Sequence, residues 1–451
     1  MNPIWLSSKW ARPFVACGFV LFVITSCVVY RMVEQLDGMT RRRGMKDGSF
    51  LLPLVHLRHN PQSFGHRNGV GSSNSKTDEE LYYIRLDSLR YRYEQNHSMT
   101  DHHIATLVQQ LRKELSIQLP TNPKMSYDIY NCPSKPPLEY PMEWNLIQIL
   151  TNWNPDHVQF PPSTMIYQGL CVFDWNRHDH RPLLEVYRRA EVPFVLQNYP
   201  DLLRTAERWS HKGYLSKLVG PGRYRNEYAH NSNHLMYWKA QGRGARRLPD
   251  GWKPPTQNVE LTFDEWYAKA MELEHATVTT SVDHWYFRLN GDSRQRGDFL
   301  YDELPIFLPT KQTLFMVEPN DQRGINCRFG MKGVIAETHY DFSRNWIVML
   351  GGQKRYILSH PKQCFNLELY PVGHPSARHS RINWSDPKDW QTGRFPQAMA
   401  NEVILQPGDA MYLPTSWFHF IVSLNLNYQC NARSGTTFEN RKVIADCGFP
   451  M

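Results

Sequence analysis

The chain has 451 residues and a formal charge of +8 at pH 7. Its length allows one large core, or one core with appendages. No run of basic residues interleaved with aromatic ones stands out, which argues against a nucleic-acid partner. Aromatic residues make up 13% of the chain and include 14 tryptophans. This content suits a β-rich core that lines a pocket.

The N-terminal region carries an uncharged, mostly apolar run of about 17 residues, Phe14–Tyr30. This length is at the short end for a helix that spans a bilayer, and it also suits the core of a signal peptide. A cleavage site is not clear, although Thr25–Cys27 is an alternative. We therefore expect residues 1–31 to form a short tail and an uncleaved signal anchor, which would make the chain a single-pass membrane protein.

The orientation of this anchor stays open on the sequence alone. The basic cluster Arg41–Arg43 would attract anionic headgroups and, counted with the flanking charges, places the C-terminal side in the cytosol. Two glycosylation sequons, at Asn96 and Asn383, favour a lumen instead. An even number of cysteines outside the apolar run permits disulfides, although free thiols fit the count as well. These cysteines are Cys132, Cys171, Cys327, Cys364, Cys430 and Cys447. We expect a luminal domain in the endoplasmic reticulum or Golgi.

Three segments are expected to follow the anchor. Residues 32–98 form a polar stem with a helical end, and residues 99–141 form a helix and a Pro-rich linker. The helix, Thr100–Leu119, has an apolar stripe that favours packing on the catalytic domain, and pairing with a second copy in a homodimer is the alternative. Residues 142–451 form the globular domain. We expect helices near Pro182–Ala190, Asp201–Val219 and Phe263–Glu274, and a strand-rich half from about His284.

The pattern that carries the chemistry is His339-Tyr-Asp341, with a second histidine, His419, far downstream. Residues i and i+2 of a strand point to the same face, so His339 and Asp341 can bind one ion together. Two imidazoles and one carboxylate are the ligand set of non-haem Fe(II) sites, in which the remaining positions stay open. The sequence therefore predicts a metal centre made by these three residues.

A hairpin is expected to follow the first two ligands. Val334–Ile335 and Trp346–Leu350 are apolar runs of strand length, Gly351–Gly352 is a turn signal, and Arg355–Leu358 reads as the returning strand. Lys354 begins that strand. A lysine inside a barrel needs an anionic partner, which a bound dicarboxylate would supply. The alternative is an ordinary lysine on an edge strand.

Two asparagines are weaker candidates for the same site. Asn345 follows the metal motif, and Asn431 ends a strand-like run that begins at Asn427. Either residue could support the metal and its cofactor, or simply complete turn and ladder hydrogen bonds. A Pro-Gly-Asp turn and a short strand precede His419. Three further histidines, at positions 360, 374 and 379, are interpreted as loop residues rather than ligands.

Together these motifs resemble the JmjC/cupin-like family of Fe(II)- and 2-oxoglutarate-dependent oxygenases, most of all its hypoxia-inducible-factor asparaginyl hydroxylases. The resemblance covers roughly residues 140–438. It implies a mainly β fold, a double-stranded β-helix (jelly-roll) barrel with flanking helices. It also implies that Fe(II) sits on His339, Asp341 and His419, that Lys354 binds the far carboxylate of 2-oxoglutarate, and that Asn345 and Asn431 line the cofactor site. With O2, such an enzyme would hydroxylate a protein side chain and release succinate and CO2.

The chain departs from the family at one cofactor contact. Ala336 occupies a position where the family often has Thr or Ser, and Thr338, on the same face of a regular strand, is a candidate replacement. The tyrosine that often contacts 2-oxoglutarate has three candidates, Tyr286, Tyr340 and Tyr356. Two other functions stay open. One is a non-catalytic, membrane-anchored binding protein with a cupin-like barrel, and the other is a metal-dependent cupin enzyme that does not use 2-oxoglutarate.

Overall fold

The computed structural model describes residues 126–159, 166–239, 248, 251–293 and 298–449. The predicted signal anchor at 14–30, the stem with its helical end, the helix at 100–119 and the sequon at Asn96 all lie outside this part. Within it, no helix is both long enough and apolar enough to cross a bilayer.

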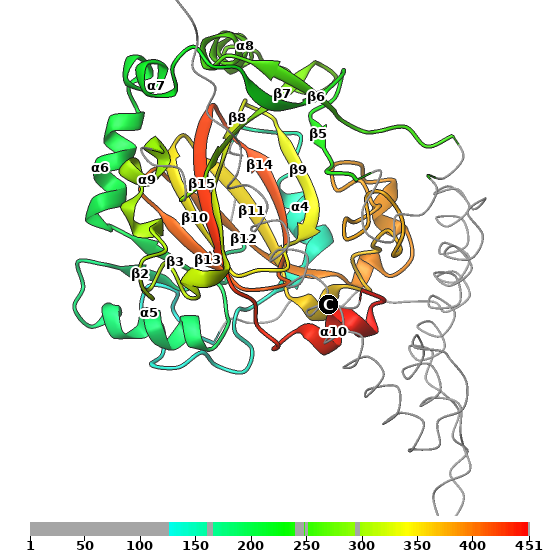
Figure 1. Ribbon diagram of the computed structural model, residues 1–451. Helices are drawn as coiled ribbons and strands as arrows, with labels where there is room; N and C mark the ends of the chain where they lie inside the picture. Colours follow the sequence, from blue (N-terminus) through cyan, green and yellow to red (C-terminus); the bar gives the residue numbers. More distant parts are fainter. Residues whose placement is uncertain (1–125, 160–165, 240–247, 249–250, 294–297, 450–451) are drawn as a thin grey trace, which may run out of the picture. The chain divides into compact units, whose positions relative to one another are not determined.

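Two β-sheets form the core of the fold (Figure 1). One sheet has six strands in the order β1-β12-β11-β14-β9-β5, and the other has nine in the order β2-β3-β13-β10-β15-β8-β7-β4-β6. The six-stranded sheet comprises β1 Trp144–Asn145, β5 His234–Leu235, β9 Ile335–Tyr340, β11 Lys354–Ser359, β12 Met399–Leu405 and β14 Phe418–Ser423. The nine-stranded sheet comprises β2 Val172–Asp174, β3 Phe194–Gln197, β4 Tyr224–Ala229, β6 Gln257–Leu261, β7 His284–Gly291, β8 Gln322–Gly330, β10 Asn345–Gly351, β13 Ala410–Leu413 and β15 Asn427–Ser434.

The chain passes from one sheet to the other at almost every turn between β8 and β15. β8, β10, β13 and β15 belong to the nine-stranded sheet, whereas β9, β11, β12 and β14 belong to the six-stranded one. Alternation of consecutive strands between two antiparallel sheets is the winding of a double-stranded β-helix. The structure therefore confirms the predicted fold class.

The same winding corrects the predicted hairpin. β10 pairs with β13 and β15, and β11 pairs with β12 and β14, so the two strands do not pair with each other. The Gly351–Gly352 turn instead carries the chain across the barrel from one sheet to the other. Gly352 has φ +63°, and a Cβ atom there would clash with the carbonyl oxygen of Leu426. An apolar run, a Gly-Gly turn and a second apolar run describe both arrangements equally well, so the sequence could not separate them.

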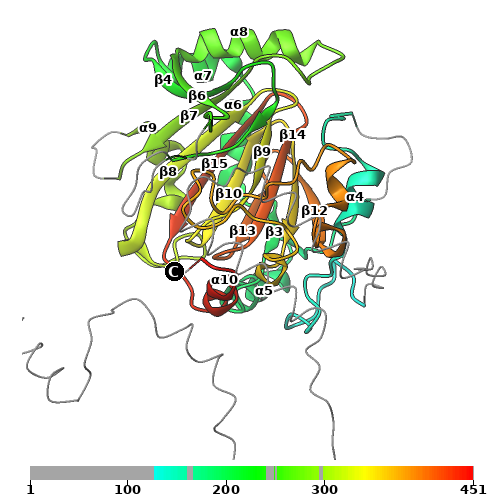
Figure 2. The ribbon, with the colours of Figure 1, turned by 90° about the vertical axis from the view of Figure 1, so that its right-hand side faces the viewer.

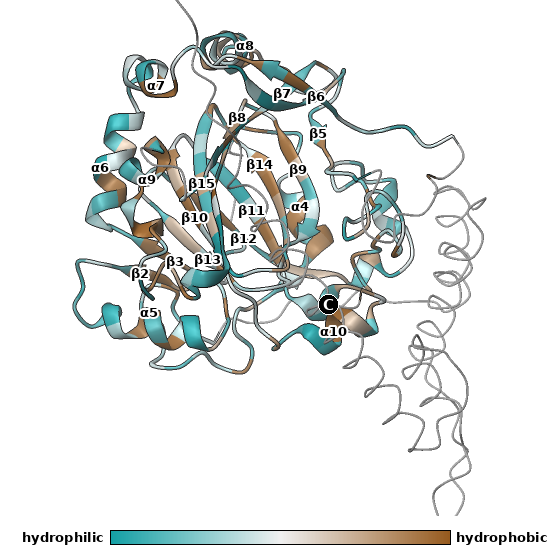
Figure 3. Cartoon of the chain, viewed as in Figure 1, coloured by the Kyte–Doolittle hydropathy of each residue, from teal (hydrophilic) through white to brown (hydrophobic). Residues whose placement is uncertain are grey.

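The space between the sheets is filled by a small apolar cluster at the centre of the barrel. Its strand residues come from β2, β3, β10, β11, β12, β13 and β14 and include Ile347, Tyr356, Leu358, Met411 and Ile421. Figure 3 shows hydrophilic stretches on β11 and β15 beside these apolar ones. Lys354 on β11 and Gln429 and Asn431 on β15 are buried, so part of the interior is polar, and that part contains the candidate site.

Helices cover the outer face of the nine-stranded sheet (Figure 1). Trp209 of α6, Leu215 of α7 and Trp266 of α8 share one buried cluster with Phe329 of β8. Figure 2 shows α8 above β4 and β6, and α4 beside β12. The helices are α4 Leu146–Asn152, α5 His180–Arg189, α6 Pro200–Trp209, α7 Lys212–Val219, α8 Phe263–Glu274, α9 Phe299–Glu303 and α10 Arg441–Asp446. Short 3-10 turns η2–η6 lie at Pro305–Phe307, Pro319–Asp321, Pro361–Gln363, Asp389–Gln391 and Phe395–Gln397.

The predicted helices agree with these elements with one difference. α8 begins and ends at the expected residues. Thr262 and Glu265 form a reciprocal capping box that fixes its start. α5 matches the helix expected near Pro182–Ala190. The segment expected as helix from 201 to 219 is two helices, α6 and α7, because His211 between them has an extended backbone.

All six cysteines in the described part of the chain form disulfides. The pairs are Cys132–Cys171, Cys327–Cys430 and Cys364–Cys447. The first attaches the segment before β1, which was expected to be linker up to residue 141, to the start of β2. In the same segment the Tyr127 hydroxyl donates to the Gly169 carbonyl at 2.5 Å. Residues 126–141 therefore pack against the barrel.

Candidate metal centre

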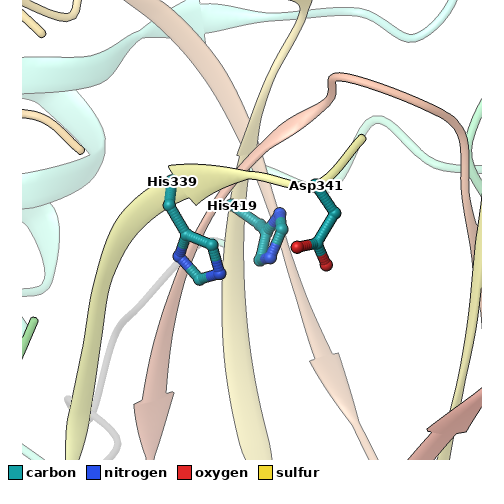
Figure 4. Close-up of side chains that lie close together, drawn as sticks. All are labelled: His339, Asp341 and His419. Carbon is teal, nitrogen blue, oxygen red and sulfur yellow. The ribbon is translucent and has the colours of Figure 1, made fainter. Parts of the chain in front are cut away.

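The three predicted ligands come together at one end of the barrel (Figure 4). His339 lies on β9 directly opposite His419 on β14, and Asp341 immediately follows β9. One ligand atom from each lies within 4.8 Å of the others. The two imidazole centroids are 4.3 Å apart. In the described residues this is the one group of three or more potential ligands with such spacing.

A β-bulge in β9 sets the orientation of this strand near the ligands. His339 opposes His419 and Ala336 opposes Ile421, so two residues of β9 face a single residue of β14. Such a bulge breaks the regular alternation of side chains. The expectation that Thr338 shares the face of Ala336 assumed a regular strand, which β9 is not at this point. The Thr338 hydroxyl is buried without a hydrogen-bond partner among the described residues.

Backbone contacts orient both imidazoles toward the same point. His339 Nδ1 donates to the carbonyl of Glu337 at 2.7 Å, and His419 Nδ1 donates to that of Trp417 at 3.1 Å. These bonds leave each Nε2 as the free nitrogen, as in metal sites where the second ring nitrogen fixes the tautomer. Burial lowers the pKa of both histidines, and for His339 the neighbouring imidazole of His419 adds to the effect. Both rings are therefore neutral at pH 7, the form that binds metals.

Asp341 is held ionised by a basic neighbour. Arg433 donates to its Oδ2 from Nε at 3.0 Å and from a terminal nitrogen at 2.6 Å. Burial alone would raise the pKa of Asp341, but the charge of Arg433 keeps it well below the usual range. Asn345 also donates to Oδ2, at 3.4 Å, and in turn accepts from Asn431 at 2.9 Å. Because these bonds use Oδ2, the other oxygen stays available for an ion.

The donor set therefore fits a divalent transition metal. It offers two neutral imidazole nitrogens and one carboxylate oxygen from one side, which is the facial arrangement of non-haem iron sites. Asn345 and Asn431, the weaker candidates, are both brought to this site through the Asp341 network.

Lys354 is fully buried at the start of β11, a central strand paired on both sides, so the edge-strand interpretation is wrong. Its ammonium donates to the Tyr286 hydroxyl at 2.8 Å and to Gln429 Oε1 at 2.9 Å. Burial, with the nearby charge of Arg328, lowers its pKa well below the usual value. No ion pair of the described residues includes Lys354, so its charge has no acidic partner there.

The structure also selects among the three tyrosine candidates. Tyr286 contacts the Lys354 ammonium directly, and Tyr356 donates to the same Gln429 oxygen at 2.6 Å. Tyr340 lies elsewhere, packed against Phe418, and its hydroxyl has no partner among the described residues. Tyr286 is therefore the tyrosine that lies beside the lysine.

Lys354 and the metal ligands face the same side of one sheet. Leu358 pairs with His419 and Lys354 pairs with Ser423, so the two positions are four residues apart along adjacent strands. At the rise of a β-strand this is about 13 Å between Cα atoms. The lysine side chain covers part of that distance, which leaves room for a short dicarboxylate between its ammonium and the triad.

Comparison with known proteins places this arrangement in a family. The sequence profile described as a cupin-like domain matches residues 181–433, more than half of the chain. The protein belongs to the cupin-like family. Its relatives include the tRNA wybutosine-synthesizing protein 5 of Danio rerio, 29% identical over 38% of this chain and 52% of that protein. They also include the lysine-specific demethylase 8 of Xenopus tropicalis, 30% identical over 38% and 40%, respectively. The chain spans about half the length of these relatives or less.

Several residues of the cupin-like site were not foreseen from the sequence. Arg433 and Gln429 lie on β15 two residues to either side of Asn431, so the alternation of that strand was the available signal. His379 was assigned to a loop, and its ring stacks on His339 with centroids 5.2 Å apart. Burial lowers the pKa of His379 to about 3, so its uncharged ring packs beside the metal ligand His339. Its distance from the triad in sequence gave no sign of this contact.

Proposed function

We propose that this protein is a membrane-anchored Fe(II)- and 2-oxoglutarate-dependent oxygenase that hydroxylates a protein side chain and releases succinate and CO2. The observation that carries the proposal is the buried Lys354. Its unmatched charge lies on the same face of the barrel as a three-residue donor set. A buried cation without a counter-charge is costly. A ligand with one carboxylate for Lys354 and a second chelating end for the metal removes that cost.

Each residue of the site has a definite role in this proposal. His339, Asp341 and His419 would hold Fe(II), and Asn345 and Asn431 would keep Asp341 in place. Lys354, with Tyr286, would bind the far carboxylate of 2-oxoglutarate. Bound iron, with 2-oxoglutarate and O2, supplies the oxidising chemistry. The protein's own contributions are two neutral imidazoles, an ionised carboxylate held by Arg433, and a closed apolar wall.

The site residues support the metal and the cosubstrate more directly than they support any one class of substrate. The relatives carry names of a lysine demethylase and of a tRNA-modifying protein. We favour side-chain hydroxylation of a protein because of the resemblance to hypoxia-inducible-factor asparaginyl hydroxylases and the absence of a basic aromatic stripe in the sequence. A non-catalytic cupin-like binding protein and a cupin enzyme without 2-oxoglutarate are the alternatives. The intact donor set argues against the first and Lys354 against the second.

The proposed setting is the lumen of the endoplasmic reticulum or Golgi, with the chain anchored through residues 14–30. Disulfides persist in oxidising compartments and are rare in the cytosol. The three disulfides of the described residues support this setting. A homodimer through residues 100–119 stays part of the proposal.

Succinate release tests the proposed activity. The purified full-length chain is incubated with Fe(II), ascorbate and 2-oxoglutarate, beside a His339→Ala/Asp341→Ala variant and a Lys354→Met variant. We expect slow release in the wild type and none in the double variant. Release that persists without the ligands contradicts the metal site, and release that persists in Lys354→Met contradicts the use of 2-oxoglutarate. If the wild type neither turns over nor binds Fe(II), the protein is a binding module.

A further inference from the structure

A second basic side chain faces the barrel interior next to the Lys354 site. Arg328 lies on β8 between Cys327 and Phe329, which are both buried in the core beneath the outer helices. Because side chains alternate along a strand, Arg328 points to the opposite, inner face. Its partner across the sheet on β15 is Gln429, the residue that accepts from Lys354.

The inner face of these strands carries more positive than negative charge. Arg433 is paired with Asp341, and Arg288, the β7 partner of Arg328, is paired with Glu227. Arg328 is in none of the ion pairs of the described residues. Its guanidinium donates a hydrogen bond to a backbone carbonyl, that of its neighbour Cys327, at 3.0 Å. Lys354 and Arg328 are thus two interior basic residues that form no ion pair with an acid in the described part of the chain.

The two cations differ in how far solvent reaches them. Lys354 is fully buried, whereas Arg328 is half-buried. Burial, together with the charge of Arg288, lowers the pKa of Arg328 to about 9, and the charge of Glu227 opposes this shift only in part. Guanidinium groups in such positions bind planar anions through two parallel hydrogen bonds. Arg328 therefore has both the chemistry and the access to bind an anion that enters from outside.

We propose that Arg328 binds a carboxylate of the primary substrate, so that the protein prefers acidic substrates. This inference rests on the proposed function. In that function one carboxylate of 2-oxoglutarate goes to the metal and the other to Lys354, and the cosubstrate has no third. The carboxylate on Arg328 then belongs to the second ligand, and an aspartate or glutamate close to the modified residue supplies it.

The first arm of the test separates the substrate from the cosubstrate as the source of the carboxylate. The affinity for 2-oxoglutarate is measured with Mn(II) in place of iron, for the wild type and for Arg328→Gln and Lys354→Met in the full-length chain. We expect Lys354→Met to weaken binding at least tenfold and Arg328→Gln to change it less than twofold. Equal weakening in the two variants would assign Arg328 to the cosubstrate and overturn the proposal.

The second arm measures the preference for acid. Two synthetic peptide pools, identical except that Asp and Glu in one are Asn and Gln in the other, are titrated into protein saturated with Mn(II) and N-oxalylglycine. We expect the wild type to bind the acidic pool about tenfold more tightly, a difference of about 1.4 kcal/mol. Arg328→Gln should lose this preference, and Arg328→Lys should keep part of it and report that the fold is intact.

Equal binding of the two pools by the wild type, or an acid preference that survives in Arg328→Gln, would overturn the proposal. The proposed function fails separately, when the wild type does not bind 2-oxoglutarate in the first arm. An acid preference that depends on Arg328 would stand even then.

Discussion

Lys354 is the residue on which the chemical assignment most depends. Its ammonium is buried between Tyr286 and Gln429 and is in no ion pair of the described residues. We expect 2-oxoglutarate with Mn(II) to raise the melting temperature of the wild type by several degrees and that of Lys354→Met by much less, because the charge that binds the far carboxylate is gone. Differential scanning fluorimetry measures both shifts, and Lys217→Met, the same substitution at an exposed lysine on α7, serves as a matched control. Equal shifts in wild type and Lys354→Met would contradict the assignment.

His234 makes the stability of the protein depend on pH. Its Nδ1 lies 2.5 Å from Glu337, and its Nε2 lies 3.6 Å from Asp156. Burial would lower the pKa of His234, but the charge of Glu337 and the hydrogen bonds to both acids raise it to about 10. The folded value lies above the unfolded value of about 6.5. The stabilisation is therefore complete below pH 6.5 and is lost as the pH rises toward 10.

We expect His234→Gln to lower the free energy of unfolding by about 2–4 kcal/mol at pH 6 and by progressively less from pH 7 to pH 10. Urea unfolding of wild type and variant across this range measures the difference. A constant difference between pH 6 and pH 10 would show that His234 contributes by packing and not by charge.

At the scale of elements, the disulfide Cys327–Cys430 joins β8 and β15, the strands that carry Arg328, Gln429 and Asn431. The bridge closes a loop of 103 residues. Loops of this length restrict the unfolded chain enough to stabilise the folded state by about 3–5 kcal/mol. A Cys327→Ala/Cys430→Ala variant should therefore unfold at a clearly lower temperature. Reductant should shift the wild type toward the variant, and identical unfolding of the two proteins would count against the bridge.

Local sequence patterns were sufficient to predict the helices and strands whose caps or apolar runs lie within the element or directly beside it. The helix Phe263–Glu274 has its cap within the helix sequence, and the apolar runs around His339 mark β9 and β10. The alternation of strands between two sheets could be predicted only from the family resemblance, because strands that pair lie far apart in the chain. The hairpin error has the same cause, since no residue near Gly351–Gly352 specifies which sheet the next strand joins.

The candidate site divides in the same way. His339, Asp341 and His419 could be predicted because their residue types and spacing match one kind of metal site. Lys354 could be predicted because a lysine in an apolar strand needs an anionic partner. Arg433 and His379 were not predicted. The alternation of β15 puts Arg433 two residues from Asn431, but nothing in the sequence indicates its ion pair with Asp341. His379 reaches the site through the path of a long loop, which composition does not determine.

At the scale of the whole molecule, the proposed luminal setting would allow glycosylation at two sequons, and we expect only one of them to carry a glycan. Asn383 is half-buried, its side-chain oxygen accepts from the Ser385 amide at 2.9 Å, and Ser385 is buried. Folded structure around Asn383 leaves little room for a glycan. We expect glycosidase treatment of the protein from animal cells to give a mobility shift that Asn96→Gln abolishes and Asn383→Gln preserves. The absence of any shift would argue for the cytosolic orientation of the anchor.

The buried, unmatched ammonium of Lys354 has a consequence for the amount of protein in a cell. A ligand that binds only the folded state stabilises it by about 2.7 kcal/mol when its concentration is a hundred times the dissociation constant. Without that ligand Lys354 stays buried, in no ion pair of the residues that the structure describes, and the folded state lacks this stabilisation. Chaperones and proteases act on the unfolded fraction, and changes of this size alter abundance several-fold. The steady-state level of the protein would then follow the supply of the metabolite that neutralises Lys354.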